Sequence, residues 1–145
     1  MGKRTATRRE GLAIEAIDPQ SGKRMVVTVS HQKLLSLIQR SEGQIKEAAT
    51  TVPMVLQKPR AVFRGLMRDG DEPRAKSEEG WLCYCGVPAV AYNADGSERA
   101  PWPNEVFLVF VSSEKVVYNW YWSPCDPQNP ELPEGYLERF KERAL

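Results

Sequence analysis

The chain has 145 residues, of which 41% are hydrophobic and 27% charged, and its formal net charge is +1. These values fit one globular domain, which we expect at residues 11–145 behind a basic leader at residues 1–10. The longest apolar run is the six residues 106–111, far below the roughly 20 that a membrane helix needs. Since no signal-peptide pattern follows the leader, the sequence predicts a cytoplasmic protein with no membrane partner.

Charge is divided unevenly along the chain. Residues 1–76 carry 15 Lys and Arg against 8 Asp and Glu, whereas residues 77–145 carry 5 against 11. A basic face could attract a polyanion such as RNA. Complementary docking of the two halves within one domain explains the same numbers. The charge pattern leaves both interpretations open.

The first half of the chain predicts a β-hairpin and then a helix. Apolar residues at 12–17 and 25–30 flank a turn at 18–22, which is a hairpin signal. Helical spacing follows over 31–50, or over two helices meeting near residue 41, where Ser41 to Gln44 has the form of a capping box. We expect the helix to end before Pro53, and 53–59 to form one turn and a loop.

The second half predicts strands. These are 61–66, 81–85, 106–111 and 116–122, with a mobile polar loop at 67–80 and a turn-rich loop at 93–104. Strict alternation in 116–122 places Tyr118, Trp120 and Trp122 on one face and Val117, Asn119 and Tyr121 on the other. The Pro-rich segment 123–133 predicts no regular structure, and 135–145 predicts a short helix with Tyr136, Leu137 and Phe140 inward.

This order of elements indicates an α+β fold. We expect a mainly antiparallel four-stranded sheet packed on the N-terminal helix, because hairpin-like connections join the strands. The N-terminal hairpin and the short C-terminal helix are additions to that core.

The three cysteines, Cys83, Cys85 and Cys125, are expected to be reduced, since an odd number without a secretion signal does not indicate a disulfide framework. Cys83 and Cys85 share one face of a predicted strand. With His31 the three thiols could form a Cys3His zinc site. The spacing differs from the usual Cys-x2-4-Cys of such sites, so we expect small buried side chains and no metal or cofactor.

The sequence contains no phosphate-loop, dinucleotide-binding, zinc-protease or serine-hydrolase motif. A mechanism that uses histidine would depend on His31, beside the predicted start of the helix, where the helix dipole favours a neutral imidazole. A surface histidine without a function fits that position as well.

Two arginines are better candidates. Arg60 and Arg64 have the same parity on the predicted strand, and paired guanidinium groups suit a phosphate. Asn119 and Tyr121 are polar positions on an otherwise apolar strand and could complete a site for phosphodiester cleavage. Pairing of the arginines with the acidic second half is the alternative.

Aromatic residues also allow two interpretations. Stacking of exposed rings on bases would suit single-stranded RNA, whereas packing in the core is the usual role of aromatics on strands. The residues concerned are Trp81, Tyr84, Trp102, Trp120, Tyr121 and Trp122.

Residues 41–122 resemble phage-associated members of the barnase, EndoU, colicin and RelE-like (BECR) nuclease superfamily. The similarity lies in a helix followed by Leu56-Gln-Lys-Pro59 and Val62-Phe63, then a polar loop and paired apolar strands. It implies metal-independent RNA cleavage on the concave face of a sheet, in a toxin-like or phage-related setting. It also implies that Arg60 and Arg64 clamp phosphate and that Tyr121 or His31 transfers protons.

The sequence therefore leaves two functions open. One is a ribonuclease-like domain with a site at His31, Arg60, Arg64, Asn119 and Tyr121. The other is a non-catalytic domain that binds a protein partner, such as an antitoxin, an immunity protein or an adaptor. Convergence of the arginines with Tyr121 in one cleft would favour the first, and arginines held in salt bridges would favour the second.

Overall fold

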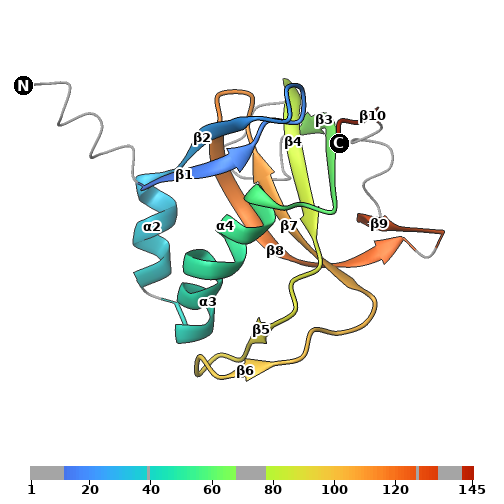
Figure 1. Cartoon of the computed structure of the whole chain (residues 1–145). Coiled ribbons are helices and arrows are strands. Elements are labelled where there is room, and N and C mark those ends of the chain that lie inside the picture. The colour runs from blue at the N-terminus through green and yellow to red at the C-terminus, as the bar shows by residue number, and fades with distance from the viewer. Residues whose placement is uncertain (1–11, 39, 68–77, 127, 134–141) are drawn as a thin grey trace, which may run out of the picture.

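A computed structural model describes residues 12–38, 40–67, 78–126, 128–133 and 142–145. These residues form one sheet in the order β1-β2-β8-β7-β4-β3-β10, with β9 paired to β8, and a separate β5-β6 pair (Figure 1). The strands are β1 Leu12–Ile17, β2 Arg24–Val29, β3 Ala61–Met67, β4 Glu78–Gly86, β5 Ala91–Tyr92, β6 Glu98–Arg99, β7 Glu105–Val111, β8 Val116–Asp126, β9 Asn129–Pro133 and β10 Glu142–Arg143. The helices are α2 His31–Ile38, α3 Glu42–Lys46, the π-helix η1 Glu47–Thr51 and α4 Val52–Gln57.

The predicted four-stranded antiparallel sheet on an N-terminal helix is wrong. The described residues are mostly β, and the main sheet is an eight-stranded mixed sheet with short helices beside it. The N-terminal hairpin is part of this sheet, because β2 pairs in parallel with β8 through Thr28 opposite Val116 and Val29 opposite Val117. Such a pairing joins residues almost 90 positions apart and leaves no local sequence signal.

The predicted C-terminal helix is also contradicted where it can be examined. Glu142 and Arg143 form β10, which pairs antiparallel with Phe63 and Arg64 of β3. The rest of that prediction, with Tyr136, Leu137 and Phe140, lies outside the described residues, as do the basic leader and positions 68–77 of the predicted polar loop. The strands extend into both ends of that loop, to Met67 and from Glu78.

The helical prediction for 31–50 holds in its two-helix form. Ser41 caps α3: its hydroxyl accepts from the Gln44 N–H at 3.3 Å, and its own N–H donates to Gln44 Oε1 at 3.4 Å. The expected end before Pro53 is wrong, since α4 continues to Gln57. Pro53 lies in the first turn of α4, directly after the π-helix, where the wider turn accommodates a residue without an N–H.

The prediction that segment 123–133 has no regular structure is wrong as well. Strand β8 continues to Asp126 and β9 pairs with it through Cys125 opposite Pro133 and Asp126 opposite Asn129. Prolines are tolerated there because β9 pairs with β8 only at its end, outside the main order of the sheet.

A β-bulge in β8 changes which side chains share a face. Phe110 pairs with Asn119 while Val111 pairs with Val117, so Tyr118 is an extra residue. As a result Tyr118 packs in a different cluster from Trp120 and Trp122, contrary to the predicted alternation. Beyond the bulge Trp120 lies on the same side as Val117.

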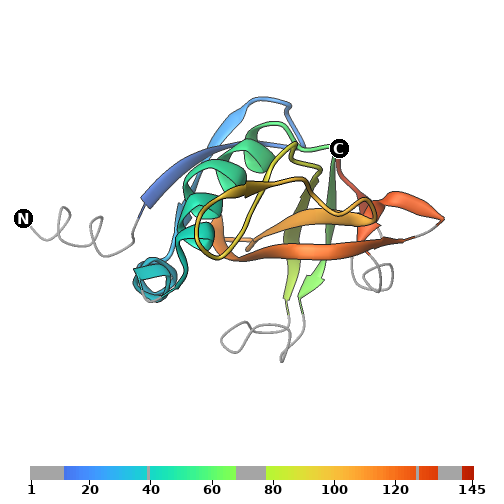
Figure 2. The same cartoon turned by 90° about the horizontal axis from the view of Figure 1, so that it is seen from below.

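The core has two clusters, one on each face of the sheet. The helix-facing cluster combines Leu37, Val52, Val55 and Leu56 of the helices with apolar residues of the strands. Figure 2 shows these helices along one face of the sheet. The far-face cluster contains Trp81, Phe110 and Leu132, among others. On the helix face, a cavity opens where α2 and α3 lie beside β8.

Candidate functional site

The cavity lies between α2, α3 and η1 on one side and β8 on the other, and its volume is about 420 Å³. On the helical side the lining residues recur every three or four positions, but they come from separate elements: α2, the bend at Arg40, α3 and η1. The lining residues are Lys33, Leu37, Arg40, Gln44, Glu47, Asn119, Trp120, Tyr121 and Trp122.

Lys33 connects the helical wall to the strand. Its ammonium group donates to Asn119 Oδ1 at 2.9 Å and lies 4.7 Å from the centroid of the Trp120 ring. Asn119 is oriented in turn, because the same Oδ1 accepts from the Trp120 N–H at 2.9 Å. Lys33 is therefore a positive charge held at a defined place in the cavity wall.

Glu47 is the carboxylate of the cavity. It is the first residue of the π-helix, a type of irregularity that often occurs at functional sites. Burial raises the pKa of Glu47, and the Trp122 indole and the Arg99 guanidinium offset part of that rise. The contact between Trp122 and the carboxylate falls short of full hydrogen-bond geometry, since Trp122 Nε1 is buried without a hydrogen-bond partner. A carboxyl group in such surroundings is suited to exchange protons nearer to neutral pH.

Arg40 is the second cation of the lining. Its side chain is exposed and forms no ion pair with any residue that the structure describes. Gln44, one turn further on, is held by the Ser41 capping box. The cavity thus combines two cations, one carboxyl group of raised pKa and an oriented amide.

The structure brings only two of the five predicted site residues to this cavity. Asn119 lines it as described. Tyr121 borders it, but its ring lies in the far-face cluster against Phe110, with centroids 5.6 Å apart. The predicted common face of Val117, Asn119 and Tyr121 is therefore wrong, since Val117 lies in the helix-facing cluster. His31 is exposed at the start of α2 and lies outside the lining. Trp120 and Trp122 also line the cavity.

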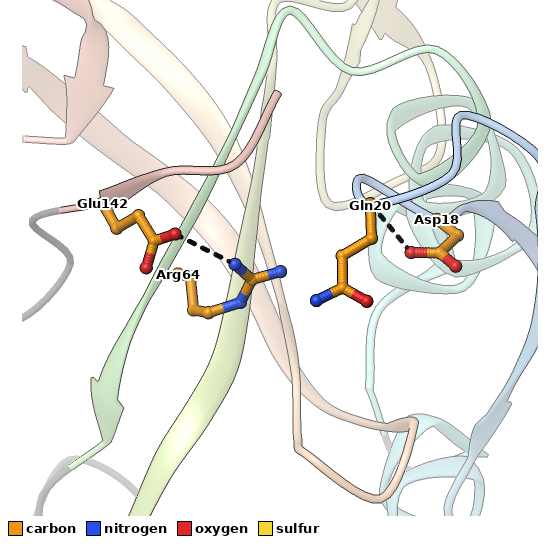
Figure 3. Close-up of polar contacts among 4 residues, drawn as sticks. All are labelled: Asp18, Gln20, Arg64 and Glu142. Carbon is orange, nitrogen blue, oxygen red and sulfur yellow. Dashed lines mark hydrogen bonds and ion pairs between the residues drawn. The ribbon is translucent and has the colours of Figure 1, made fainter.

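Arg64 lies at a different cavity, of about 280 Å³, between β3 and the turns that follow β1 and β7. Its guanidinium pairs with Glu142 Oε1 at 3.2 Å and points toward Gln20, whose N–H donates to Asp18 Oδ1 at 3.0 Å (Figure 3). Arg60 precedes β3, is exposed, and donates its N–H to the carbonyl of Cys85 at 2.8 Å. The two arginines therefore do not share a cavity with Asn119 and Tyr121.

The cysteines behave as small interior side chains, as expected for Cys83 and Cys85. Both are fully buried with their sulfurs 3.8 Å apart, and Cys125 is half-buried. Within the described parts of the chain, no group of three or more His, Cys, Asp or Glu side chains is arranged to hold a metal ion.

The aromatic residues divide between the core and the surface. Trp81 and Tyr84 are buried in the core, and Trp120 is nearly so. Trp102, in contrast, is 58% exposed.

Sequence reasoning missed Lys33, Arg40 and Glu47. One signal was available: with Leu37 and Gln44 they are spaced by four, three, four and three residues, which is the spacing of a single helical stripe. Polar residues with this spacing usually face solvent, and here the chain bends between α2 and α3, so their convergence beside β8 is a tertiary feature that the spacing does not show.

Comparison with known proteins adds one partial similarity. The chain is 26% identical over 126 residues to a flavonoid 3-O-glucosyltransferase from Medicago truncatula, a match that covers 81% of this chain. The chain spans 28% of the length of that relative. No family model and no solved structure matches the chain. In the described residues, no helix has the length and apolar character required to span a bilayer.

Proposed function

We propose that the chain is a metal-independent ribonuclease whose active site is the cavity between α2, α3 and η1 on one side and β8 on the other. One observation carries this proposal: Glu47, with its raised pKa, lines the same cavity as the cations Lys33 and Arg40. The residues that carry the resemblance to BECR nucleases, Leu56 to Pro59 with Val62 and Phe63, do not line this cavity, so the proposal rests on the cavity itself.

In the proposed reaction Glu47 acts as the general base. Its carboxylate accepts the proton of a ribose 2′-hydroxyl, and the 2′-oxygen forms a bond to the adjacent phosphorus. The bond from phosphorus to the 5′-oxygen breaks, and the leaving oxygen takes a proton from water. The hydroxide that remains takes the proton from Glu47, which becomes a carboxylate again. The products are a 2′,3′-cyclic phosphate and a 5′-hydroxyl. DNA lacks the attacking group and is not a substrate.

Lys33 and Arg40 stabilise the negative charge that builds up on the phosphate oxygens. Lys33 is suited to this role because Asn119 and Trp120 hold its ammonium in place before substrate binds. Arg40, being exposed at the cavity, is free to approach a second phosphate oxygen or the next phosphate along the strand.

The test is cleavage of end-labelled RNA by the purified full chain in EDTA. Glu47→Gln should lower the rate by about 100-fold or more, the size of effect that general acid–base catalysis supplies. The Arg60→Ala, Arg64→Ala double variant is the matched control and should retain activity, since neither residue lines the cavity. Loss of activity in the control but not in Glu47→Gln would refute this site. Intact RNA at all protein concentrations would refute the function and favour the protein-binding alternative.

The similarity to the glucosyltransferase makes glucosyl transfer a second candidate. A carboxylate such as Glu47 could also accept a proton from an acceptor hydroxyl. The short match to that much longer relative is its sole support. Incubation of the chain with a nucleotide-activated glucose and a flavonoid tests it directly, and a glucosylated product formed in place of RNA cleavage would favour this candidate.

A further inference from the structure

Trp102 is an exposed aromatic ring in the loop after β6. It is 58% exposed, more than any other large apolar side chain in the described part of the molecule. The Arg99 guanidinium lies over the ring at 4.0 Å from its centroid and donates to the carbonyl of Ala100 at 3.1 Å. Arg99 therefore covers one side of the indole and leaves most of the ring open to solvent.

Neither Arg99 nor Trp102 lines the cavity, but the charge of Arg99 reaches it. The charge of Arg99 acts on the Glu47 carboxyl group and lowers its pKa against the effect of burial. One residue thus contacts the exposed ring and also influences the carboxyl group of the cavity.

The β5-β6 hairpin that carries Arg99 is fixed to α3. The Gly43 N–H donates to the carbonyl of Ala94 at 3.3 Å, and Lys46 Nζ donates to the carbonyl of Gly96 at 2.8 Å. Thr50 and Tyr92 add a hydroxyl contact of 3.2 Å. The position of Arg99 relative to Glu47 is therefore set by several contacts with the helix.

We propose that Trp102 and Arg99 form a base-binding subsite that makes the cavity selective for single-stranded RNA. A base would stack on the open side of the Trp102 ring, and the guanidinium on the other side would strengthen that stack and attract the neighbouring phosphate. This inference rests on the proposed ribonuclease function, and it names the substrate class of the same site.

Selectivity follows from the geometry of stacking. In a duplex the faces of each base are covered by its neighbours, so a protein ring can reach only the groove edges and the backbone. A single strand can splay one base out and offer its face to an exposed indole. Any of the four bases can stack in this way, so we expect little sequence preference at the subsite.

The experiment is fluorescence anisotropy with a labelled RNA 12-mer, used single-stranded or annealed to its complement, and full-length Glu47→Gln protein so that the RNA stays intact. Trp102→Ala should weaken single-strand binding about tenfold, within the range seen for removal of one base-stacking ring. Trp102→Phe should restore most of the affinity. Val26→Ala on β2, an exposed apolar side chain on another element, is the control and should bind as its parent does.

The outcomes separate the subsite from the catalytic function. Weaker single-strand binding in Trp102→Ala, with little duplex binding in either protein, supports the subsite even if the wild-type chain cleaves no RNA. Equal binding of both RNA forms, or an unchanged affinity in Trp102→Ala, overturns the subsite even if wild-type protein cleaves RNA. Absence of RNA binding in every protein overturns the subsite and the ribonuclease together.

Discussion

The Lys33 ammonium on α2 lies 4.7 Å from the centroid of the Trp120 ring on β8. Both residues line the cavity, and their contact joins α2 to β8. The hydrogen bond from Lys33 to Asn119, at 2.9 Å, acts across the same junction. The pair thus has a structural role besides the catalytic one proposed.

Replacement of Lys33 by Met keeps the long aliphatic stem and removes the charge. Both the cation–π contact and the charged hydrogen bond to Asn119 are lost, so we expect the free energy of unfolding to fall by about 1–2 kcal/mol. Urea denaturation monitored by tryptophan fluorescence measures this change. Lys23→Met, at an exposed position in the first turn, is the control and should differ from wild type by under about 0.5 kcal/mol. An equal effect of both variants would contradict the role assigned to Lys33.

Gly43 permits the close approach of α3 and the β5-β6 hairpin. A Cβ atom at this position would lie 2.0 Å from the carbonyl oxygen of Asn93, so one backbone must move. Gly43→Ala should therefore destabilise the protein by about 1–3 kcal/mol, even though alanine favours a helix.

Hydrogen exchange at the Asn93 N–H, which donates to the Ser97 carbonyl, locates that effect in the hairpin. Exchange there should accelerate more than at the Val62 N–H in the sheet. Gly22→Ala serves as the comparison, because its added methyl group meets nothing within 4 Å and only the positive φ of 72° opposes it. An unaltered exchange rate at Asn93 in Gly43→Ala would show that the hairpin does not depend on this contact.

The fold was predictable from the sequence where neighbours in the chain are neighbours in space. The β1-β2 hairpin and the β7-β8 pair were expected because short turns bring their strands together, as in the turn at Gly22 with its positive φ. The parallel β2-β8 pairing and the β10-β3 pairing were not, since each joins distant segments whose sequences are equally compatible with other partners.

The candidate site was harder to predict for the same reason. Asn119 was identified as an unusual polar residue on an apolar strand, but its partner Lys33 lies 86 positions away. A bulge at Tyr118 then broke the alternation from which the facing residues were inferred. The sequence around Glu47 did not indicate a functional residue, because the raised pKa of Glu47 arises from burial against β8.

The cysteines provide a third prediction, on thiol reactivity. Burial raises the pKa of the Cys125 thiol, with Cys85 adding to the rise and Arg60 opposing it. A smaller thiolate fraction reacts more slowly, so iodoacetamide at pH ~8 should modify Cys125 more slowly than free cysteine. Cys83 and Cys85 are fully buried and should react only after unfolding.

Mass spectrometry of peptides from native and urea-unfolded protein measures all three rates. Cys125→Ser should abolish labelling of the native chain and leave the labelling of unfolded protein at two sites. Native labelling of Cys83 or Cys85 at the rate of Cys125 would mean that this end of the sheet opens readily.

Glu47 allows a test of the cavity that is independent of any substrate. Because burial raises its pKa above the ordinary value of 4.5, the folded chain keeps a proton on Glu47 in a pH range where the unfolded chain has lost it. Stability contributed by this group is therefore present below pH 4.5 and decreases as the pH rises through the pKa of the folded state. Glu47→Gln removes that loss, so the variant should gain stability relative to wild type as the pH rises from about 4 to neutrality.

Urea denaturation of both proteins at several pH values gives the difference directly. Asp95→Asn is the control of opposite sign, because hydrogen bonds from Ser97 lower the pKa of Asp95. Its stabilising contribution is present at neutral pH and disappears on acidification, so Asp95→Asn should be less stable than wild type at pH 7 and converge with it in acid. A difference between Glu47→Gln and wild type that stays constant with pH would mean that Glu47 ionises as it does in the unfolded chain. In that case the carboxyl group would lack the property that suits it to act as the general base.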